Sequence, residues 1–285
     1  MNRFTLLFAL FLPLAAVFAQ SPEPLVMPAT PRTIGLGGAY VALADDPAAG
    51  YLNPSGLREM SQIGYDLFFG SRTSGGADQL GMFLTNPATE RGTAFAMGAW
   101  AQGWTRHRQI IYFVPYSGTS FDLTSSTHFG LVLRAPYISS RVSGISSHWE
   151  TVGDVSFLQT FESLRLGAAL ERAFGGGEEF IPRRLRCGGA FLSSSSGVAF
   201  TYEWDGDQGV KSFRFVRSSS HYGAEIRLGK FAVVRGGYIA GPTHRVAFGL
   251  ALGNLKEGWR LDGGWEIPAA EKGDTHWVVG MGYRI

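Results

Sequence analysis

The sequence contains one cysteine, Cys187, among 285 residues. An intramolecular disulfide and a cysteine-based metal cluster are therefore excluded. Lysine is nearly as scarce, so arginine carries almost all of the positive charge. Charged residues make up 17% of the chain, against roughly 25% in ordinary soluble proteins, and the net charge is +2. Because the arginines are interleaved with acidic residues, no basic stripe forms and no nucleic-acid partner is expected.

Long apolar runs are absent beyond the N-terminus, so no later segment reaches the roughly 20 residues that a membrane helix needs. Residues 1–19 are interpreted as a signal peptide, with Arg3 before the apolar run and a small-x-Ala cleavage site at Ala19. A retained membrane helix is the alternative, but the run spans only about 15 residues and contains Pro13. We expect an exported protein that begins at Gln20, in which any membrane crossing is made by strands.

Patterns of catalysis and metal binding are also missing. The six histidines are far apart and never show metal-ligand spacing. The glycines from Gly35 to Gly38 lack the Lys-Ser/Thr of a phosphate loop, and Ser193–Ser196 and Ser218–Ser220 are interpreted as turns. Asp45 and Asp46 could be acid/base carboxylates, but helix capping explains Asp46. We therefore expect no enzyme, no metal and no cofactor, although a barrel hydrolase with a converging Ser, His and acid remains an open alternative.

The dominant pattern, from Ile63 onward, is alternation with a period of two over segments of eight to eleven residues. Phe200 and Tyr202, for example, alternate with Thr201 and Glu203. One face of each segment is apolar, with aromatics near the ends, and the other mixes glycine, alanine and charges of both signs. A soluble sandwich would instead favour Lys, Thr and Ser on its polar face, whereas aromatic girdles are typical of outer-membrane barrels. The sequence predicts an all-β fold, a transmembrane antiparallel β-barrel.

Fifteen segments fit this pattern, and because single-chain bacterial barrels have even strand numbers, we expect about 14 strands, with 149–158 as the weakest candidate. The candidates are 63–70, 77–85, 92–101, 104–114, 126–135, 149–158, 163–172, 184–192, 196–204, 210–217, 221–229, 231–239, 244–253, 258–267 and 275–284. Longer connections are expected at 115–125, 136–148 and 173–183. They would first meet a ligand or partner, or they are idle surface loops.

The polar faces of these segments would point charges into the lumen. Mutual ion pairing that stiffens the barrel is favoured over contact with a substrate, because arginine suits fixed, paired charges. The expected lumen charges are Arg134, Arg165, Glu171, Arg186, Glu203, Glu225, Arg227, Arg235, Arg245, Arg260, Asp262 and Glu266.

Ahead of the strands, residues 20–31 hold four prolines and are expected to be an extended lead-in. The stretch that follows, residues 32–57, is rich in glycine and alanine. Asp46-Pro47 predicts a helix start, with Asp as the N-cap. Asn53-Pro54-Ser55-Gly56 predicts a turn into the first strand.

Within this stretch, GLGGAYVALADDPAAGYLNPSGL (residues 35–57) resembles the N-terminal signature of the FadL-type outer-membrane transporter superfamily, to which PorV/PorQ-type barrels are related. The matching parts are a Gly-rich start, an ALADD core and an Asn-Pro-small-Gly close. The resemblance implies a barrel at 61–285 and a lumenal hatch, or plug, at 32–60. By position the hatch residues would be Gly37, Gly38, Asp45, Asp46, Asn53, Pro54 and Gly56.

The resemblance also implies a location and a function. We expect the outer membrane of a Gram-negative-type bacterium, with its lipid around the barrel. In FadL-type members, hydrophobic molecules bind at the outer face and leave sideways through a wall opening made by a strand kink. A passive channel for small hydrophobic molecules is the leading hypothesis. The alternatives are a PorV/PorQ-type barrel that docks secreted proteins without transport, and a structural barrel without a ligand.

Overall fold

The computed structural model describes residues 28–73, 78–87, 93–103, 110–140, 146–175, 181–193, 196–208, 215–242, 244–254, 257–269 and 274–285. The expected signal peptide and most of the lead-in at 20–31 lie outside these ranges. Within them, no helix has the length and apolar content that crossing a membrane requires.

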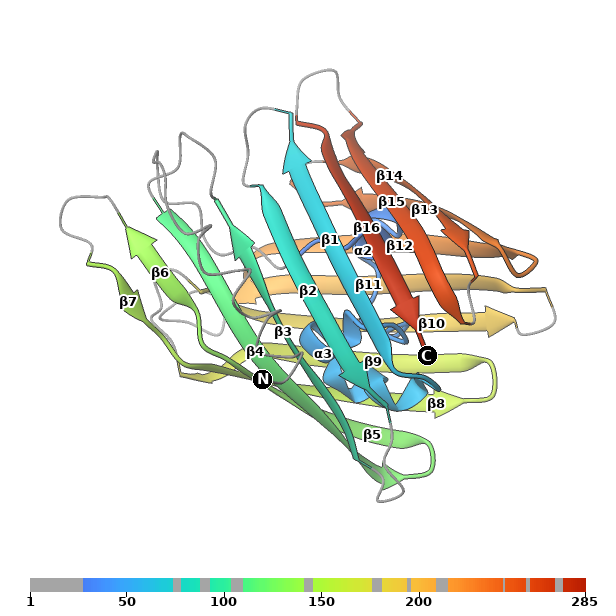
Figure 1. The fold of residues 1–285 in the computed structure, drawn as a ribbon, viewed down its shortest axis with the longest axis horizontal. Helices are drawn as coiled ribbons and strands as arrows, with labels where there is room; N and C mark the ends of the chain where they lie inside the picture. The colour runs from blue at the N-terminus through green and yellow to red at the C-terminus, as the bar shows by residue number, and fades with distance from the viewer. Residues whose placement is uncertain are drawn as a thin grey trace, which may run out of the picture.

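Strands make up most of the described chain, and three short helices precede them (Figure 1). The helices are α2 (Pro31–Gly35), α3 (Ala49–Leu52) and the 3₁₀ helix η2 (Pro54–Glu59). The strands are β1 (Gly64–Arg72), β2 (Gln79–Asn86), β3 (Thr93–Gln102), β4 (Ile110–Thr124), β5 (Thr127–Arg134), β6 (Tyr137–Ser140), β7 (His148–Trp149), β8 (Val152–Phe161), β9 (Leu164–Gly175), β10 (Arg183–Ser193), β11 (Val198–Gln208), β12 (Phe215–Leu228), β13 (Ala232–Ala240), β14 (Arg245–Gly253), β15 (Gly258–Pro268) and β16 (His276–Arg284).

All strand pairs are antiparallel and close into a ring of 14 wall strands, because β1 pairs with β16 and β3 with β4. The labels run to β16 because two wall strands are each interrupted once. β5 and β6 lie along the same edge of β4 with one continuous register, since Tyr116 faces Arg134 and Phe113 faces Tyr137. β7 and β8 continue one another in the same way beside them.

Two prolines cause the interruption. Pro115 in β4 and Pro136 between β5 and β6 have no N–H to give to the ladder. Their carbonyls still accept, from the N–H of Ala135 at 3.0 Å and of Glu150 at 2.9 Å. The wall therefore keeps its register through this level but lacks donors in two neighbouring strands.

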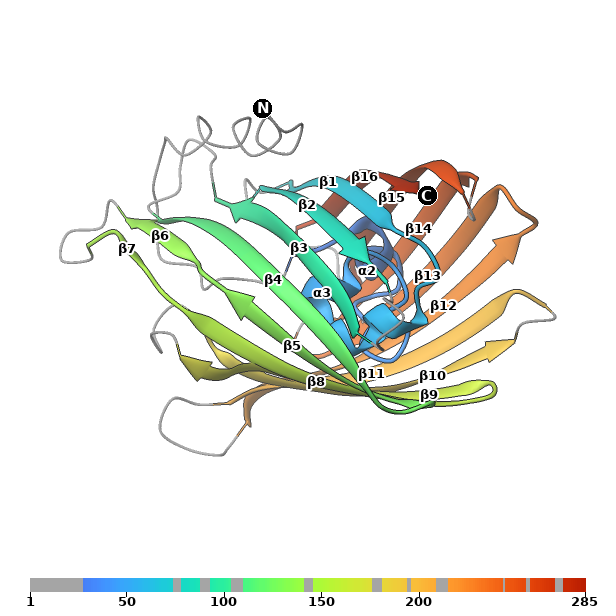
Figure 2. The ribbon, with the colours of Figure 1, turned by 60° about the horizontal axis from the view of Figure 1, so that its bottom comes forward.

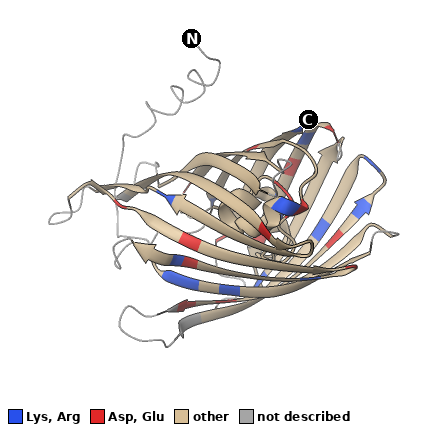
Figure 3. Cartoon of the chain, turned by 90° about the horizontal axis from the view of Figure 1, so that it is seen from below, with Lys and Arg blue, Asp and Glu red and all other residues tan. Residues whose placement is uncertain are grey.

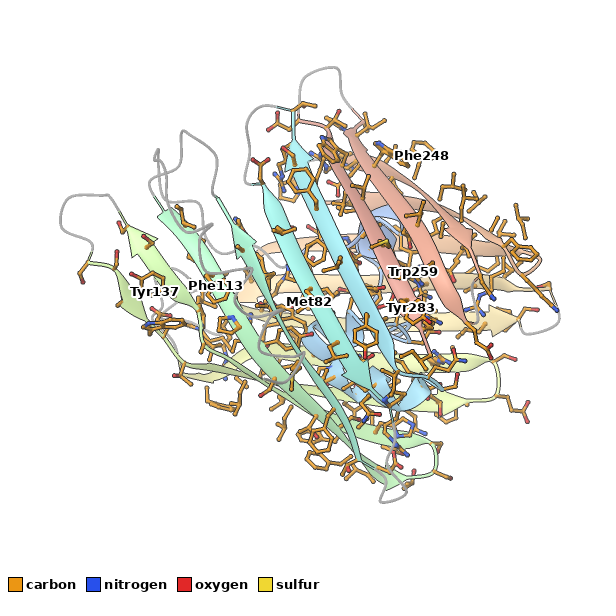
Figure 4. The ribbon with its side chains drawn as sticks, in the orientation of Figure 1. Met82, Phe113, Tyr137, Phe248, Trp259 and Tyr283 are labelled. Carbon is orange, nitrogen blue, oxygen red and sulfur yellow. The ribbon has the colours of Figure 1, made fainter. Side chains whose placement is uncertain are left out.

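The outward faces carry the apolar side chains that the alternation predicts. Phe200 is 57% exposed, while Glu203 on the other face of β11 is 1% exposed. Figure 4 labels outward-facing side chains from six strands: Met82, Phe113, Tyr137, Phe248, Trp259 and Tyr283. An apolar exterior around a charged interior is the arrangement of a membrane-spanning barrel. The predicted fold class is confirmed.

Two details of the strand prediction are wrong, and its weakest candidate is confirmed as a strand. The segments 210–217 and 221–229 are not two strands, since β12 is continuous through Ser218–Ser220, which pair with β11, and Ser220 also pairs with β13. The candidate 149–158 is a real wall strand, now β8. The expected connection 115–125 lies almost wholly within β4. In each case the paired neighbours decide the conformation and override the local preference of serine or proline for turns.

The expected connection 136–148 is also shorter than predicted, because β6 occupies its first part. Short turns, such as 125–126 and 162–163, lie at the end of the barrel where β1 begins and β16 ends. We call this the turn end. The strand ends that flank 141–147, 176–182 and 209–214 lie at the opposite end, which we call the loop end.

Residues 28–60, here called the N-terminal segment, lie inside the ring and are almost entirely buried (Figure 2). α2 packs against β13 to β16, and η2 packs against β3, β4, β5 and β8 on another side. Between them the chain passes the inner faces of β12, β10 and β9 at Gly223, Gly188 and Gly167. The N-terminal segment thus follows the inner circumference of the barrel.

Glycines on both partners permit this close approach. A Cβ on Gly237 of β13 would overlap the backbone of Gly37, whose own φ is +61°. The preceding residue, Gly236, has no atom within 4 Å of the position that its Cβ would occupy. Neighbouring glycines in one strand therefore differ completely in what they contact.

We expect Gly237→Val to unseat the N-terminal segment or destabilise the folded barrel by about 1–3 kcal/mol, as overpacking does. Gly236→Val is the matched control and should leave stability unchanged. Thermal unfolding of the purified protein, followed by its mobility on gels without boiling, measures both. Equal midpoints for the two variants would contradict the contact between Gly237 and Gly37.

Candidate functional site

The interior is organised around Arg32, in the second residue of α2. Its side chain is 5% exposed and meets three carboxylates. Nη1 lies 2.5 Å from Asp45 and 3.0 Å from Asp46, while Nε lies 2.9 Å from Glu225 of β12. Arg32 thereby joins two parts of the N-terminal segment to the wall through charge-assisted hydrogen bonds.

The ion pairs continue along the wall from Glu225. Arg235 of β13 contacts Glu225 at 2.9 Å and Asp262 of β15 at 2.7 Å. Arg260 then contacts Asp262 at 3.5 Å and Asp66 of β1 at 3.3 Å. The chain of alternating charges therefore crosses the closure between the last and first strands. Figure 3 shows acidic and basic positions on the strands around the enclosed segment.

A second branch leaves Asp45 in the other direction. Arg165 of β9 lies 3.4 Å from Asp45 and 2.7 Å from Glu59 at the end of η2. Burial alone would raise the pKa of Asp45, but the guanidinium groups of Arg32 and Arg165 outweigh it and hold that pKa below its ordinary value. Asp45 is thus ionised at neutral pH.

Glu203 of β11 binds the backbone of the N-terminal segment directly. One carboxylate oxygen accepts from the N–H groups of Tyr40 and Val41 at 2.8 and 2.7 Å, and the other accepts from Arg186 at 2.5 Å. Nearby, His221 of β12 hydrogen-bonds the carbonyl of Gly37 at 2.6 Å. These bonds satisfy backbone groups that burial would otherwise leave without partners.

Tyr51 fixes the other side of the segment. Its hydroxyl accepts from Arg134 of β5 at 3.0 Å, and Arg134 also pairs with Asp154 of β8. The Tyr51 ring meets Tyr116 edge-on at 5.1 Å and Trp100 edge-on at 5.9 Å between centroids. Tyr51 therefore touches both a buried ion pair and an aromatic cluster.

The lumen is divided into two sectors by these side chains. From β1 to β6 the inward face holds a cluster of apolar, mostly aromatic side chains, which we call the aromatic sector, together with polar side chains such as Gln102 and Arg134. From β9 to β16 the inward face carries most of the ion pairs described above, and the others involve Asp66 of β1 and the Arg134–Asp154 pair of β5 and β8. The buried residues of the aromatic sector are Phe68, Phe83, Trp100, Tyr112, Val114, Tyr116 and Ile138.

Cavities remain at both mouths of the barrel, and charged side chains line them. At the turn end, a cavity of about 250 Å³ is lined by Arg32, Glu225 and Arg284, and an adjoining one of about 710 Å³ by Asp45, Arg165 and Arg227. At the loop end, a cavity of about 160 Å³ lies above the N-terminal segment. No group of three metal-ligating side chains occurs in the described part of the chain.

The charges predicted for the lumen all have acidic or basic partners in the structure. Arg134, Glu171, Arg186, Glu203, Glu225, Arg235, Asp262 and Glu266 are buried, and the side chains of Arg165, Arg245 and Arg260 are 12–16% exposed. Arg227 differs, because its side chain is 54% exposed and lies 3.7 Å from Glu225 at the turn-end mouth.

The predicted hatch residues lie inside the barrel, with one correction. α3 begins at Ala49 rather than at Asp46-Pro47, and no side chain caps it. Asp46 accepts from the N–H of Ala48 at 3.0 Å, but its carboxylate also binds Tyr40 at 2.6 Å and Arg32. The carboxylate of Asp46 is oriented toward Arg32 because the buried guanidinium needs a nearby negative charge.

The Asn-Pro-Ser-Gly turn is held by its own side chains. Asn53 donates to the carbonyl of Val41 and accepts from Ser55 at 2.5 Å, and Pro54 opens η2. A Cβ on Gly56 would overlap the carbonyl of Ala44, so only glycine fits here. Gly38, with φ +85°, packs against His221.

Several interior residues were not predicted. Arg32 and Glu59 lie just outside residues 35–57, and Tyr40 and Tyr51 lie within them. The alternation that identifies inward residues in strands does not apply to this part of the chain. Asp66, Asp154 and Asp205 lie on inward strand positions, where alternation around Phe68, Val152 and Glu203 could have found them. The arginine that pairs with each of these aspartates depends on the register between strands, which the sequence alone does not give.

The fold and the interior together define a membrane-spanning β-barrel whose lumen is occupied by its own N-terminal segment. No protein-family model matches the chain, and no curated protein matches it in sequence. Among solved structures, the monoaromatic hydrocarbon channel CymD matches with a TM-score of 0.68 at 13% identity, over 92% of this chain and 99% of that one. The toluene transporter TodX of Pseudomonas putida matches with 0.67 at 12% identity, over 95% and 99%. At these identities the similarity concerns the fold, and at that level the resemblance to FadL-type barrels is confirmed.

We expect Arg32→Gln to release the N-terminal segment, because it leaves Asp45, Asp46 and Glu225 without their shared cation. Removing one partner of a buried ion pair costs about 3–5 kcal/mol. Arg227→Gln, at an exposed arginine that shares Glu225, should cost less than about 1 kcal/mol. Limited proteolysis of the detergent-solubilised protein, with cleavage sites mapped to 28–60, reads out release. Protection of this segment in both variants alike would refute the role of Arg32.

Proposed function

We propose that this protein is a channel in the outer membrane for small hydrophobic molecules, with the N-terminal segment as its hatch. The observation that carries the proposal is the aromatic sector, whose side chains pack around Tyr51 on the inner side of β1 to β6. An aromatic lining solvates apolar molecules and adds ring–ring contacts. CymD and TodX, which share the fold, are described as channels for monoaromatic hydrocarbons and toluene.

The charged cavities favour an exit through the wall over an exit through the turn end. A hydrocarbon that left past Arg32, Glu225 and Arg284 would displace water from these ionic groups without replacing its hydrogen bonds, which costs free energy. The level of Pro115 and Pro136 lies within the aromatic sector and lacks ladder donors in adjacent strands. In this proposal, hydrophobic molecules enter the lipid there. No covalent chemistry is involved.

The proposed orientation places the turn end in the periplasm and the loop end outside the cell, as in bacterial barrels with short periplasmic turns. Outer-membrane lipid would surround the exposed aromatic and aliphatic side chains. A Gram-negative-type bacterium is the corresponding source.

If the N-terminal segment is the hatch, deleting residues 32–57 should open a polar path through the lumen. We expect the deletion variant, reconstituted in liposomes, to pass a small sugar much faster than the full chain. A barrel of about this size is wide enough to become a water-filled pore once its plug is removed. Unchanged sugar flux through a correctly folded deletion variant would rule out the hatch.

Tyr51 should control hydrophobic passage, since its ring fills the aromatic sector from the hatch side. We expect Tyr51→Ala to raise toluene uptake several-fold in cells that express the protein and lack their own hydrocarbon channel. Tyr222→Ala is the matched control, because Tyr222 faces outward and is 47% exposed. If cells that express the wild-type protein take up no more toluene than cells that lack it, the protein is not a channel for toluene.

A second candidate function is a docking barrel for secreted proteins, without transport, as in PorV/PorQ-type barrels. The observation that favours it is the tight fixation of the N-terminal segment by Arg32, Glu203 and Tyr51. Specific co-purification of exported proteins, together with no toluene uptake by Tyr51→Ala cells, would select this function.

A further inference from the structure

The loop-end cavity is a small chamber of about 160 Å³ between the N-terminal segment and the wall. The wall contributes Arg72 at the end of β1 and His276 at the start of β16, which face each other across the strand pair. The N-terminal segment contributes Ala29 and Ile34, and β13 contributes Ile239. Charged groups and aliphatic groups thus line one chamber.

His276 is an unpartnered polar group within this chamber. It is 4% exposed, and its Nε2 has no hydrogen-bond partner in the described structure. A buried imidazole nitrogen without a partner is unusual in folded proteins, and each such case calls for a missing ligand or water.

Arg72 is a second unmatched group. The structure records no ion pair for it among the residues that it describes, whereas the other arginines of the chamber are neutralised. Arg186 is paired with Glu203 at 2.5 Å, and Arg184 is paired with Asp205. The positive charge of Arg72 is therefore left over.

The carboxylates of the chamber are already occupied and cannot serve these two groups. Glu266, which faces His276 across β15 and β16, is paired with Arg245. Glu203 accepts from Arg186 and from two backbone N–H groups of the N-terminal segment. Once these pairs are counted, Arg72 is the charged group of the lining without a counterion among the described residues, so the chamber attracts negative charge.

We propose that this chamber is a binding site for a small oxyanion, a carboxylate or a phosphate group, held between Arg72 and His276. The guanidinium donates to two oxygens of the anion, as it does to carboxylates and phosphates generally. The Nε2 of His276 has almost no accessible surface in the free chamber, so the ring has to turn for its Nε2–H to donate to one of these oxygens. Ala29, Ile34 and Ile239 contact the small organic body that carries the group. The volume admits a compact anion and excludes a long chain. This site does not depend on the channel proposal.

The test is a titration of the full chain, purified in detergent, with benzoate, with inorganic phosphate and with neutral benzamide, followed by calorimetry. We expect benzoate or phosphate to bind and benzamide not to bind. Arg72→Gln and His276→Gln should each weaken anion binding at least tenfold. Arg227→Gln, which removes an arginine at the opposite end, should leave it unchanged.

Each result decides the question. If benzoate binds and phosphate does not, the ligand of the chamber is an organic carboxylate. If phosphate binds as tightly as benzoate, the chamber accepts both carboxylates and phosphates. No binding of either anion, equal affinity in Arg72→Gln, or equal loss in Arg227→Gln would overturn the site. Should the wall variants fail to fold, the ring nitrogen resonances of His276 in the wild-type protein decide, because they must shift on adding the anion.

Discussion

The side chain of Arg32 is almost removed from solvent, so its charge has to be balanced by carboxylates of the protein itself. Three of them converge on it, two from its own segment and one from the wall. This requirement explains the direction of Asp46, the course of the chain between α2 and α3, and the attachment of both to β12. Because Glu225 is shared with Arg235, the same requirement extends into the wall as far as β1.

The division of the lumen follows from this arrangement. Most charges gather on the strands that hold α2 and the chain after it, whereas α3 and η2 pack against strands that carry many aromatic side chains. Tyr51 lies where the two sectors meet, with its hydroxyl on an ion pair and its ring among aromatics. One side of the segment is thus fixed mainly by ion pairs, and the other by aromatic packing together with hydrogen bonds such as that from Arg134 to Tyr51.

Alternation along the chain was sufficient to predict the barrel, the inward charges and most strands, because side-chain orientation in a strand depends only on parity. It failed where the ladder overrides local preference, as at Ser218–Ser220 in β12 and at Pro115 in β4. The contacts made by the N-terminal segment were harder to predict from the sequence. Its helix is too short to show a period, and the partner of Asp46 is an arginine 14 residues away in sequence. Ion pairs between strands far apart in sequence depend on the register of the closed ring.

The path of the N-terminal segment has a consequence for the topology of the fold. Ala29 lies at the loop end, where its N–H bonds Gln79, whereas residue 60 leads into β1 at the turn end. The chain therefore passes through the ring from one mouth to the other. Nine paired positions between β1 and β16 then lock the ring around it. The segment therefore runs through a closed ring of strands, and the finished fold has the topology of a threaded loop.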